Sequence, residues 1–216
     1  MNEISLEVWG DHALFSRPES KVERLTYPVM TPSAARGILN AIYVKPVEFY
    51  WQVRRIEVLK PIRYMSFRRN EVRSRIGKRL KPILVEDERT QRQSVVLKDV
   101  RYRITASIIK RPGFKGTDTQ LVEQARRRIK SGKCFFQPSL GTREFVCYFE
   151  EAGTAEPIHE DLDIGLMLYD VFDLHRFDVS EKTEPFITLF HAQMKNGVID
   201  IPPFDDDAVL KPVKEG

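Results

Sequence analysis

The amino-acid sequence predicts an α+β fold, in which a ferredoxin-like (RRM-like) domain is followed by a C-terminal antiparallel β extension. Three observations support this prediction. The expected elements follow the order strand, helix, strands, helix, strands. Both helical segments carry one apolar stripe, so we expect both to cover one side of a sheet. The later strands include a strong hairpin signal, which favours an appended antiparallel sheet.

The first part of the chain predicts a strand, a helix and a long second strand. Residues 4–10 alternate apolar and polar side chains, as a half-buried strand does. Thr31 is the expected N-cap of the helix, Pro32 suits its first turn, and a Lys-Pro sequence predicts that it ends near Tyr43. Residues 49–69 are rich in β-branched and aromatic side chains, which predicts one long strand.

The middle and the end of the chain predict the remaining elements. Residues 70–94 are highly charged and poorly patterned, which indicates a mobile loop or a hairpin insert. Residues 94–110 predict another strand, and residues 117–133 predict a second helix with Gly132 at its C-terminal cap. Further strands are predicted within residues 137–151, 161–174 and 187–202, the last forming a hairpin centred on Asn196-Gly197.

Composition and motifs exclude several classes of protein. The chain has 216 residues, 42% of them hydrophobic and 31% charged, which is ordinary for a globular protein with a core. No apolar run approaches the roughly 18–20 residues of a membrane span, and the first residues do not resemble a signal peptide. Cys134 and Cys147 lack metal-ligand spacing and are expected to be reduced thiols. We therefore expect a cytoplasmic protein without membrane contact, cofactor or metal.

Charge is unevenly distributed along the chain. The formal net charge is only +4, yet basic residues dominate between residues 54 and 111 and again between 126 and 133. Acidic residues dominate between 150 and 207. Such asymmetry predicts one face for a polyanion and another for solvent or a protein partner. Arginine outnumbers lysine in the first basic region, and its planar fork suits phosphate oxygens.

Aromatic residues alternate with these arginines, a combination that suits RNA because bases stack on aromatic rings and phosphates bind guanidinium groups. The alternative is that the aromatic residues form the core while the arginines only face solvent, and both arrangements fit opposite faces of one strand. We expect residues 1–140 to form the RNA-binding domain, with a basic insert at about 68–94, and residues 141–216 to form the β extension. The expected RNA-binding residues are Arg54, Arg55, Arg68, Arg69, Arg73, Arg75, Lys78, Arg126, Arg127 and Lys133.

Five segments, in order along the chain, resemble those of one known family. They are LEVWGDHALFSRPE, YPVMTPSAARGILNAIYVKP, SVVLKDVRYRI, SLGTRE and MKNGVIDIP. Together they are similar to the CRISPR-associated Cas-five family, in the d or Dvulg form that belongs to type I-C systems. The resemblance covers nearly the whole chain, and it implies the same ferredoxin-like domain with a β extension.

The resemblance also implies an activity. Such proteins cut the repeat hairpin of the CRISPR precursor RNA without a metal and then remain with the mature guide RNA beside the other subunits of a type I-C interference complex. In that reaction the ribose 2′-OH attacks its own phosphate and leaves a cyclic phosphate and a 5′-OH. Some proteins of this form also bind or nick duplex DNA, so duplex DNA is a further candidate ligand.

The catalytic roles implied by the family fall on a tyrosine, a lysine and an adjacent histidine. Tyr43, in the AIYVKP segment, matches the tyrosine. The Lys-His pair has no match, because spacing places Gln120 and Leu121 there. Lys115, nearby in sequence, is the candidate cation, and His12 is the candidate acid if the fold brings it to the site.

Three functions remain open at this stage. The first is an endoribonuclease that matures guide RNA. The second is a non-catalytic subunit that binds the handle of the guide RNA in the same complex. The third is an adaptor that docks partner proteins through the acidic residues 150–207.

Overall fold

The computed structural model describes residues 3–20, 23–73, 84–176 and 185–212. Within them the chain forms a mixed α/β fold dominated by antiparallel sheet, with few helices. The main sheet has the strand order β6-β1-β5-β3-β9, and β2 and β4 also pair with β5. Its strands are β1 (Glu3–Ala13), β2 (Arg24–Leu25), β3 (Phe49–Val58), β4 (Tyr64–Val72), β5 (Arg89–Lys110), β6 (Tyr148–Glu151) and β9 (Val198–Asp200).

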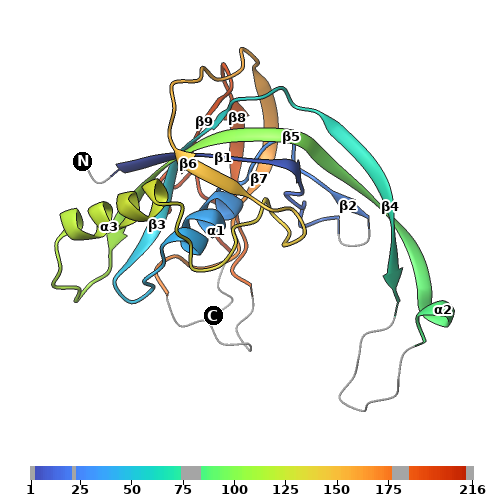
Figure 1. The fold of residues 1–216 in the computed structure, drawn as a ribbon, viewed down its shortest axis with the longest axis horizontal. Coiled ribbons are helices and arrows are strands. Elements are labelled where there is room, and N and C mark those ends of the chain that lie inside the picture. The colour runs from blue at the N-terminus through green and yellow to red at the C-terminus, as the bar shows by residue number, and fades with distance from the viewer. Residues whose placement is uncertain (1–2, 21–22, 74–83, 177–184, 213–216) are drawn as a thin grey trace.

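A smaller sheet and three helices complete the described part of the chain. β7 (Leu162–Asp170) and β8 (Thr188–Met194) pair antiparallel. The helices are α1 (Pro32–Ile42), α2 (Val85–Glu88) and α3 (Asp118–Lys130). Figure 1 shows α1 and α3 on the same side of the main sheet, while β4 and β5 extend away from it as a long arm. None of the helices in the described residues is long and apolar enough to cross a membrane.

Helix α1 forms as the sequence predicts. Thr31 is its N-cap and accepts a hydrogen bond from the Ala34 N–H at 3.2 Å, with Pro32 in the first turn. Tyr43 is its C-cap. The apolar stripe is buried, with Ile38 and Leu39 among its members, so the helix is held by packing against the sheet as well as by its caps.

Helix α3 also matches its prediction, and its N-terminus carries a reciprocal cap. Thr117 accepts from the Gln120 N–H, and the Gln120 side chain accepts from the Thr117 N–H. Ser131 caps the C-terminus, and Gly132 follows it with a φ of +63°, a backbone conformation that glycine adopts at low cost.

One strand prediction differs from the structure, and one of two alternatives is supported. Residues 49–69 form β3 and β4 rather than one strand, and the break between them contains Pro61, which cannot donate a ladder hydrogen bond. Within residues 70–94, the described part supports the hairpin alternative. β4 and β5 pair from Tyr64 and Leu97 out to Val72 and Arg89.

The Asn196-Gly197 turn is confirmed. Both residues have positive φ, and Lys195 and Val198 exchange two backbone hydrogen bonds of 2.9 Å, as in a two-residue hairpin. The strands on either side then separate: β8 pairs with β7, whereas β9 pairs with β3 at the edge of the main sheet. This turn therefore passes the chain from the small sheet to the large one.

Candidate active site and nucleic-acid interface

Tyr43 lies where α1 ends and is fixed by contacts along its backbone and its ring. Its N–H donates to the Leu39 carbonyl at 2.8 Å, and its own carbonyl accepts from the Trp51 indole N–H at 2.8 Å. Its ring packs against Phe49, with centroids 5.2 Å apart. The end of α1 and the start of β3 therefore determine where this phenol lies.

Although only 4% of Tyr43 is exposed, it lines an open pocket of about 490 Å³. The pocket lies between the turn after α1 and the first turns of α3. This position combines residues that are far apart in sequence. The lining residues are Tyr43, Lys45, Glu48, Phe114, Gly116, Gln120, Leu121 and Gln124.

The pocket combines a neutral hydroxyl with the ion pair between Lys45 and Glu48. Burial raises the pKa of the Tyr43 phenol above its usual value of 10, although Lys45 and Arg128 act in the opposite direction. The phenol is therefore protonated at neutral pH and can donate a hydrogen bond. The hydrogen bond between Lys45 Nζ and Glu48 Oε1, 2.7 Å long, raises the pKa of the Lys45 ammonium, so this group stays charged.

Helix α3 and the segment after it hold the C-terminal end of α1. Arg128 donates from Nε to the Ile42 carbonyl at 2.7 Å, and the Phe135 N–H donates to the Ala41 carbonyl at 2.6 Å. The Arg128 guanidinium also lies 5.2 Å from the centroid of the Phe135 ring. These contacts satisfy carbonyls that a helix end otherwise leaves without partners.

Of the other two predicted catalytic residues, Lys115 is next in the chain to residues that line the Tyr43 pocket, and His12 is not. Lys115 is exposed and lies between Phe114 and Gly116, both of which line the pocket. His12 is in β1 opposite Lys98, and its ring lies 5.9 Å from Phe145.

The distance between His12 and Tyr43 follows from the register of β5. Phe49, which packs on Tyr43, pairs with Lys110, whereas His12 pairs with Lys98. At about 3.3 Å per residue, these two positions are about 40 Å apart along the strand. His12 is therefore not a lining residue of the Tyr43 pocket, because the fold places it at the opposite end of the sheet.

Lys45 and Gln124, which also line the pocket, are not among the site residues predicted from the sequence. Lys45 follows Tyr43 by two residues in AIYVKP, and this short spacing could have identified it as a candidate site residue. Gln120 and Leu121, the positions that spacing aligned with the Lys-His pair, do line the pocket. None of the lining residues is a histidine. Among the described residues, no group of three or more His, Cys, Asp or Glu is placed to hold a metal ion.

The predicted RNA-binding arginines of β3 already have partners. Arg54 donates from Nε to Ser107 Oγ at 3.0 Å, and Arg55 pairs with Asp200 at 2.8 Å. Trp51 and Tyr102, two aromatic residues of the same predicted sheet, are 1% and 2% exposed and therefore belong to the core. For these two residues the alternative of core packing is correct.

The neighbouring part of the sheet is neutralised by its own carboxylates. Glu7 is 1% exposed and accepts from Arg101 Nε at 2.7 Å and from Arg103 Nη2 at 3.0 Å. Burial alone would raise the pKa of Glu7, but the hydrogen bonds from these arginines and from the Gly153 N–H outweigh it and lower the pKa. This face therefore has less net charge to offer a phosphate backbone than its arginine content indicates.

The basic residues of the β4–β5 arm differ from one another. Arg69 pairs with Glu144 at 2.6 Å and lies 5.1 Å from the Phe67 ring centroid, so it ties the arm to the body. Arg68 and Arg73 are exposed and form no ion pair within the described part of the chain. Arg75 and Lys78 lie outside the described residues.

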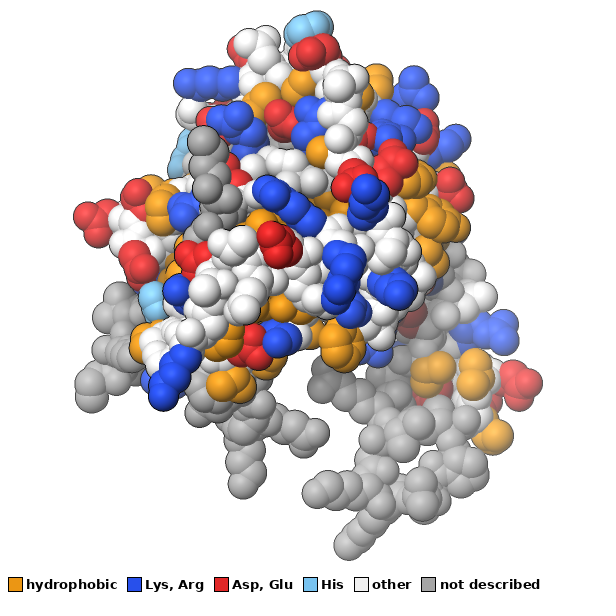
Figure 2. All heavy atoms as spheres, turned by 60° about the vertical axis from the view of Figure 1, so that its left-hand side comes forward, with side chains coloured by type: hydrophobic (Ala, Val, Ile, Leu, Met, Phe, Trp, Pro, Cys, Tyr) orange, Lys and Arg blue, Asp and Glu red, His pale blue; other side chains and the backbone are white. Residues whose placement is uncertain are grey.

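The third basic group lies on α3 and just after it. Arg126, Arg127 and Lys133 are exposed, and no carboxylate within the described ranges pairs with them. Arg128, on the same helix, contacts the end of α1 beside Tyr43. Figure 2, which turns the side of Figure 1 that bears α3 forward, shows Lys and Arg side chains spread over this face with acidic ones between them. Exposed cations thus lie in and just after the C-terminal half of α3, whereas the α3 residues that line the Tyr43 pocket are Gln120, Leu121 and Gln124.

Comparison with known proteins places the chain in a family. The family described as CRISPR-associated protein (Cas_Cas5), in its Cas5d form, matches residues 3–202. Proteins named CRISPR pre-crRNA endoribonuclease Cas5d are similar to this chain in Mannheimia succiniciproducens, at 41% identity over 97% of this chain and 99% of the relative, and in Thermus thermophilus, at 43% identity over 94% and 92%.

A solved structure supports the fold. The crystal structure of a CRISPR-associated protein matches with a TM-score of 0.68 and 23% identity, covering 96% of this chain and 95% of its own. The fold is thus that of a CRISPR-associated protein. The chain belongs to the Cas5 family, in its Cas5d form, which confirms the resemblance of the five ordered segments.

Proposed function

We propose that this protein is a cytoplasmic endoribonuclease that cuts the repeat hairpin of CRISPR precursor RNA in the Tyr43 pocket and then stays with the guide RNA in a type I-C interference complex. The names of its two relatives, which match almost their full length, support this activity. The observation that carries the assignment to this pocket is the juxtaposition of a protonated phenol and the Lys45 ammonium, with Arg128 of α3 close to the phenol.

In this proposal the pocket promotes attack by the ribose 2′-OH. A bond forms between the 2′ oxygen and phosphorus while the bond from phosphorus to the 5′ oxygen breaks, which leaves a cyclic phosphate and a 5′-OH. Tyr43 donates a hydrogen bond that orients the scissile phosphate, and Lys45 stabilises the extra negative charge of the transition state, together with Lys115, which lies in the chain between the lining residues Phe114 and Gly116. Water takes the 2′ proton and returns one to the leaving oxygen, and the reaction needs no metal.

RNA binding in this proposal depends mainly on α3 and the arm. Arg126, Arg127 and Lys133 bind phosphates on the path to the pocket, and Arg68 and Arg73 bind them along the arm. Because each neutralised phosphate releases counterions, RNA affinity should fall steeply as salt increases. The other subunits of the complex are further partners.

The finer fold assignment is also part of the proposal. A ferredoxin-like unit has the order strand, helix, strand, strand, helix, strand, with the last strand at one edge of the sheet. The order β1, α1, β3, β5, α3, β6 and the sheet order β6-β1-β5-β3, antiparallel throughout, support it. In this arrangement the unit continues to Glu151, and the β extension comprises the strands after it.

A second candidate function, a non-catalytic handle binder, is favoured by two observations. The pocket contains no histidine that could act as an acid, and only 4% of Tyr43 is exposed. Binding to phosphates along α3 needs neither a histidine that acts as an acid nor an exposed phenol. The two functions therefore share the RNA interface and differ only in the chemistry at Tyr43.

Incubating the purified protein with its own repeat RNA in EDTA separates them. If the protein is an endoribonuclease, the wild-type protein should cut the RNA at one position. Tyr43→Phe should cut it about 100-fold or more slowly, because the change removes one donor to the developing charge. Tyr64→Phe, which changes a tyrosine that is 55% exposed on the arm, is the matched control and should cleave normally. Tight binding without any cut would favour the handle binder, and equal rates for both variants would exclude Tyr43 from the chemistry.

A further inference from the structure

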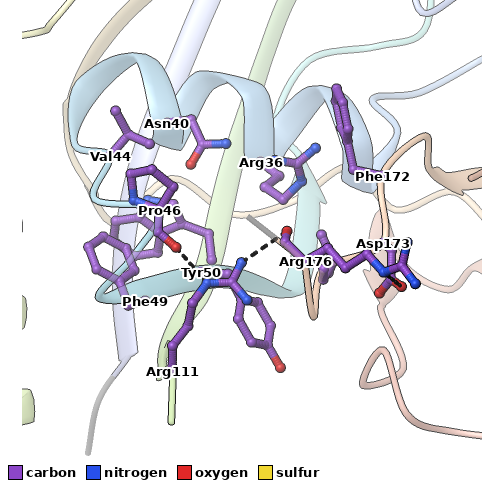
Figure 3. A pocket seen from close by; sticks show the side chains of 12 residues that line it. Arg36, Asn40, Val44, Pro46, Phe49, Tyr50, Arg111, Phe172, Asp173 and Arg176 are labelled. Carbon is purple, nitrogen blue, oxygen red and sulfur yellow. Dashed lines mark hydrogen bonds and ion pairs between the residues drawn. The ribbon is translucent and has the colours of Figure 1, made fainter. Parts of the chain in front are cut away.

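A second pocket lies on the other side of the turn that follows Tyr43. It has a volume of about 230 Å³. Tyr43, Lys45 and Glu48 face the first pocket, whereas Val44 and Pro46 face the second, so one short turn separates the two. Figure 3 shows this second pocket between α1 and Arg111. Its lining residues are Arg36, Asn40, Val44, Pro46, Phe49, Tyr50, Trp51, Arg111, Phe172, Asp173, Leu174 and Arg176.

The size and walls of this pocket suit one planar ring system. Its volume is below the range of about 300–1,000 Å³ that holds most small-molecule ligands. Tyr50 and Phe172 contribute accessible aromatic surface to its lining, and Trp51, which is 1% exposed, lies in its wall. The flat Arg111 guanidinium lies 5.3 Å from the centroid of the Tyr50 ring. Aromatic and guanidinium planes of this kind are the surfaces on which unstacked bases pack.

The Asn40 side chain, which lines the pocket, has no hydrogen-bond partner among the described residues. Asn40 is half-buried on α1, and Figure 3 shows its amide directed toward the pocket. No hydrogen bond joins this amide to another side chain or to the backbone within the described ranges. An amide presents a donor and an acceptor next to each other, and the edges of nucleobases present the complementary pair.

The groups around Asn40 are fixed. Arg36 binds Asp170 through two hydrogen bonds of 2.5 and 2.8 Å. Arg111 donates to the Pro46 carbonyl at 2.6 Å and to the His175 carbonyl at 2.9 Å, which ties the segment around residue 175 to the turn after α1. The pocket is therefore pre-formed, with cationic groups at its rim and one unmatched amide inside.

We propose that this pocket takes one nucleobase that is unstacked from the bound RNA, next to the nucleotide whose phosphate lies at Tyr43. The inference rests on the proposed function, because the two pockets share the turn between residues 43 and 49. The base packs against the aromatic and guanidinium surfaces, and the Asn40 amide hydrogen-bonds to its edge. In this way the pocket contributes to choosing the cut position.

A scan of abasic RNAs tests the proposal. Repeat RNAs that lack one base at a time are bound to the wild-type protein and to Asn40→Leu, which keeps the number and branching of the side-chain heavy atoms and removes the amide. At one position, loss of the base should weaken wild-type binding about five- to tenfold, the value of one or two hydrogen bonds, and should weaken Asn40→Leu binding much less. Gly37→Ala adds a methyl group in open space on the same helix and should behave as wild type.

A second readout does not depend on RNA binding. In a Trp9→Phe background, Trp51 in the pocket wall is the remaining tryptophan and reports on the pocket through its fluorescence. At least one of the four nucleoside 5′-monophosphates should change this emission in the Trp9→Phe protein and not after the further change Asn40→Leu.

The outcomes separate the inference from the proposed function. The base pocket would be overturned if no abasic position is coupled to Asn40 and Trp51 responds to none of the four nucleotides. If the RNA is still cut normally, the endoribonuclease proposal is unaffected. A nucleotide response that needs Asn40, in a protein that cuts no repeat RNA, would support the pocket and count against the proposed function. A pocket that instead receives a side chain from a partner protein would give no response in either readout.

Discussion

Arg128 of α3 donates from Nε to the carbonyl oxygen of Ile42 at 2.7 Å, immediately before Tyr43. The bond joins the two helices at the point where α1 ends. It also places a guanidinium group close enough to Tyr43 to favour ionisation of the phenol, against the stronger effect of burial. The basic helix and the candidate catalytic residue are therefore mechanically and electrostatically connected.

Replacing Arg128 with alanine should destabilise the protein by about 1–2 kcal/mol, because a charged hydrogen bond to Ile42 and the contact with the Phe135 ring are lost. Urea denaturation measures the change. Arg127→Ala is the matched control, since Arg127 is the adjacent, exposed residue on the same helix. This change should alter the unfolding free energy by no more than about 0.5 kcal/mol. Equal effects of the two changes would show that Arg128 does not hold the end of α1.

Removing one partner of the Arg36–Asp170 ion pair should lower the unfolding free energy more than removing one partner of an exposed pair. Asp170 is 2% exposed, and Asp170→Ala leaves the Arg36 charge without its partner, which should cost about 3–5 kcal/mol in unfolding free energy. Asp163→Ala, at an exposed carboxylate of the same strand, should cost little. A loss below about 1 kcal/mol for Asp170→Ala, read from chemical denaturation, would contradict a tightly held pair.

Glu7 should make stability depend on pH. Its carboxylate is buried, which by itself raises the pKa, but hydrogen bonds from Arg101 and Arg103 hold the pKa below 4.5. A lowered pKa in the folded state stabilises the fold above the unfolded value of about 4.5, and this contribution disappears as pH falls through the folded pKa. Glu7→Gln should therefore be clearly less stable than wild type at pH 7, and the difference should shrink near pH 3.

Urea midpoints at pH 7 and pH 3 measure this difference. Glu150→Gln, which changes a half-exposed partner of Arg101, should show a smaller dependence. A constant difference between Glu7→Gln and wild type across this range would mean that Glu7 keeps an ordinary pKa in the folded protein.

The two thiols should differ in reactivity. Cys147 is buried, and burial raises the pKa of its thiol to about 12, so the reactive thiolate is scarce at neutral pH. Cys134 is half-buried. A thiol reagent should therefore label Cys134 first, and native Cys134→Ala protein should react only as fast as it unfolds, which a titration with increasing urea will show.

Local sequence signals predicted the elements that place Tyr43. The N-cap Thr31, Pro32 and the Lys-Pro after Tyr43 act within a few residues, and the helix begins and ends where they indicate. The Asn196-Gly197 turn is equally local, because two positive φ angles follow from the residues themselves. Such features depend little on the rest of the chain.

Features that depend on distant partners could not be predicted. Arg69 looked like an RNA ligand, but its partner Glu144 is far away in sequence. His12 entered as a candidate acid because sequence contains no information on the register of β1 against β5. Lys45 and Gln124 meet in one pocket only because α3 folds back onto the end of α1.

The most direct test of the Tyr43 site is a structure of the protein bound to its repeat RNA, with a single 2′-deoxy substitution at the cut nucleotide to prevent cleavage. We expect the scissile phosphate to lie in the Tyr43 pocket, with an oxygen about 2.6–3.2 Å from the phenol oxygen and near Lys45. A complex in which the cut nucleotide is bound elsewhere and Tyr43 contacts no RNA would contradict it.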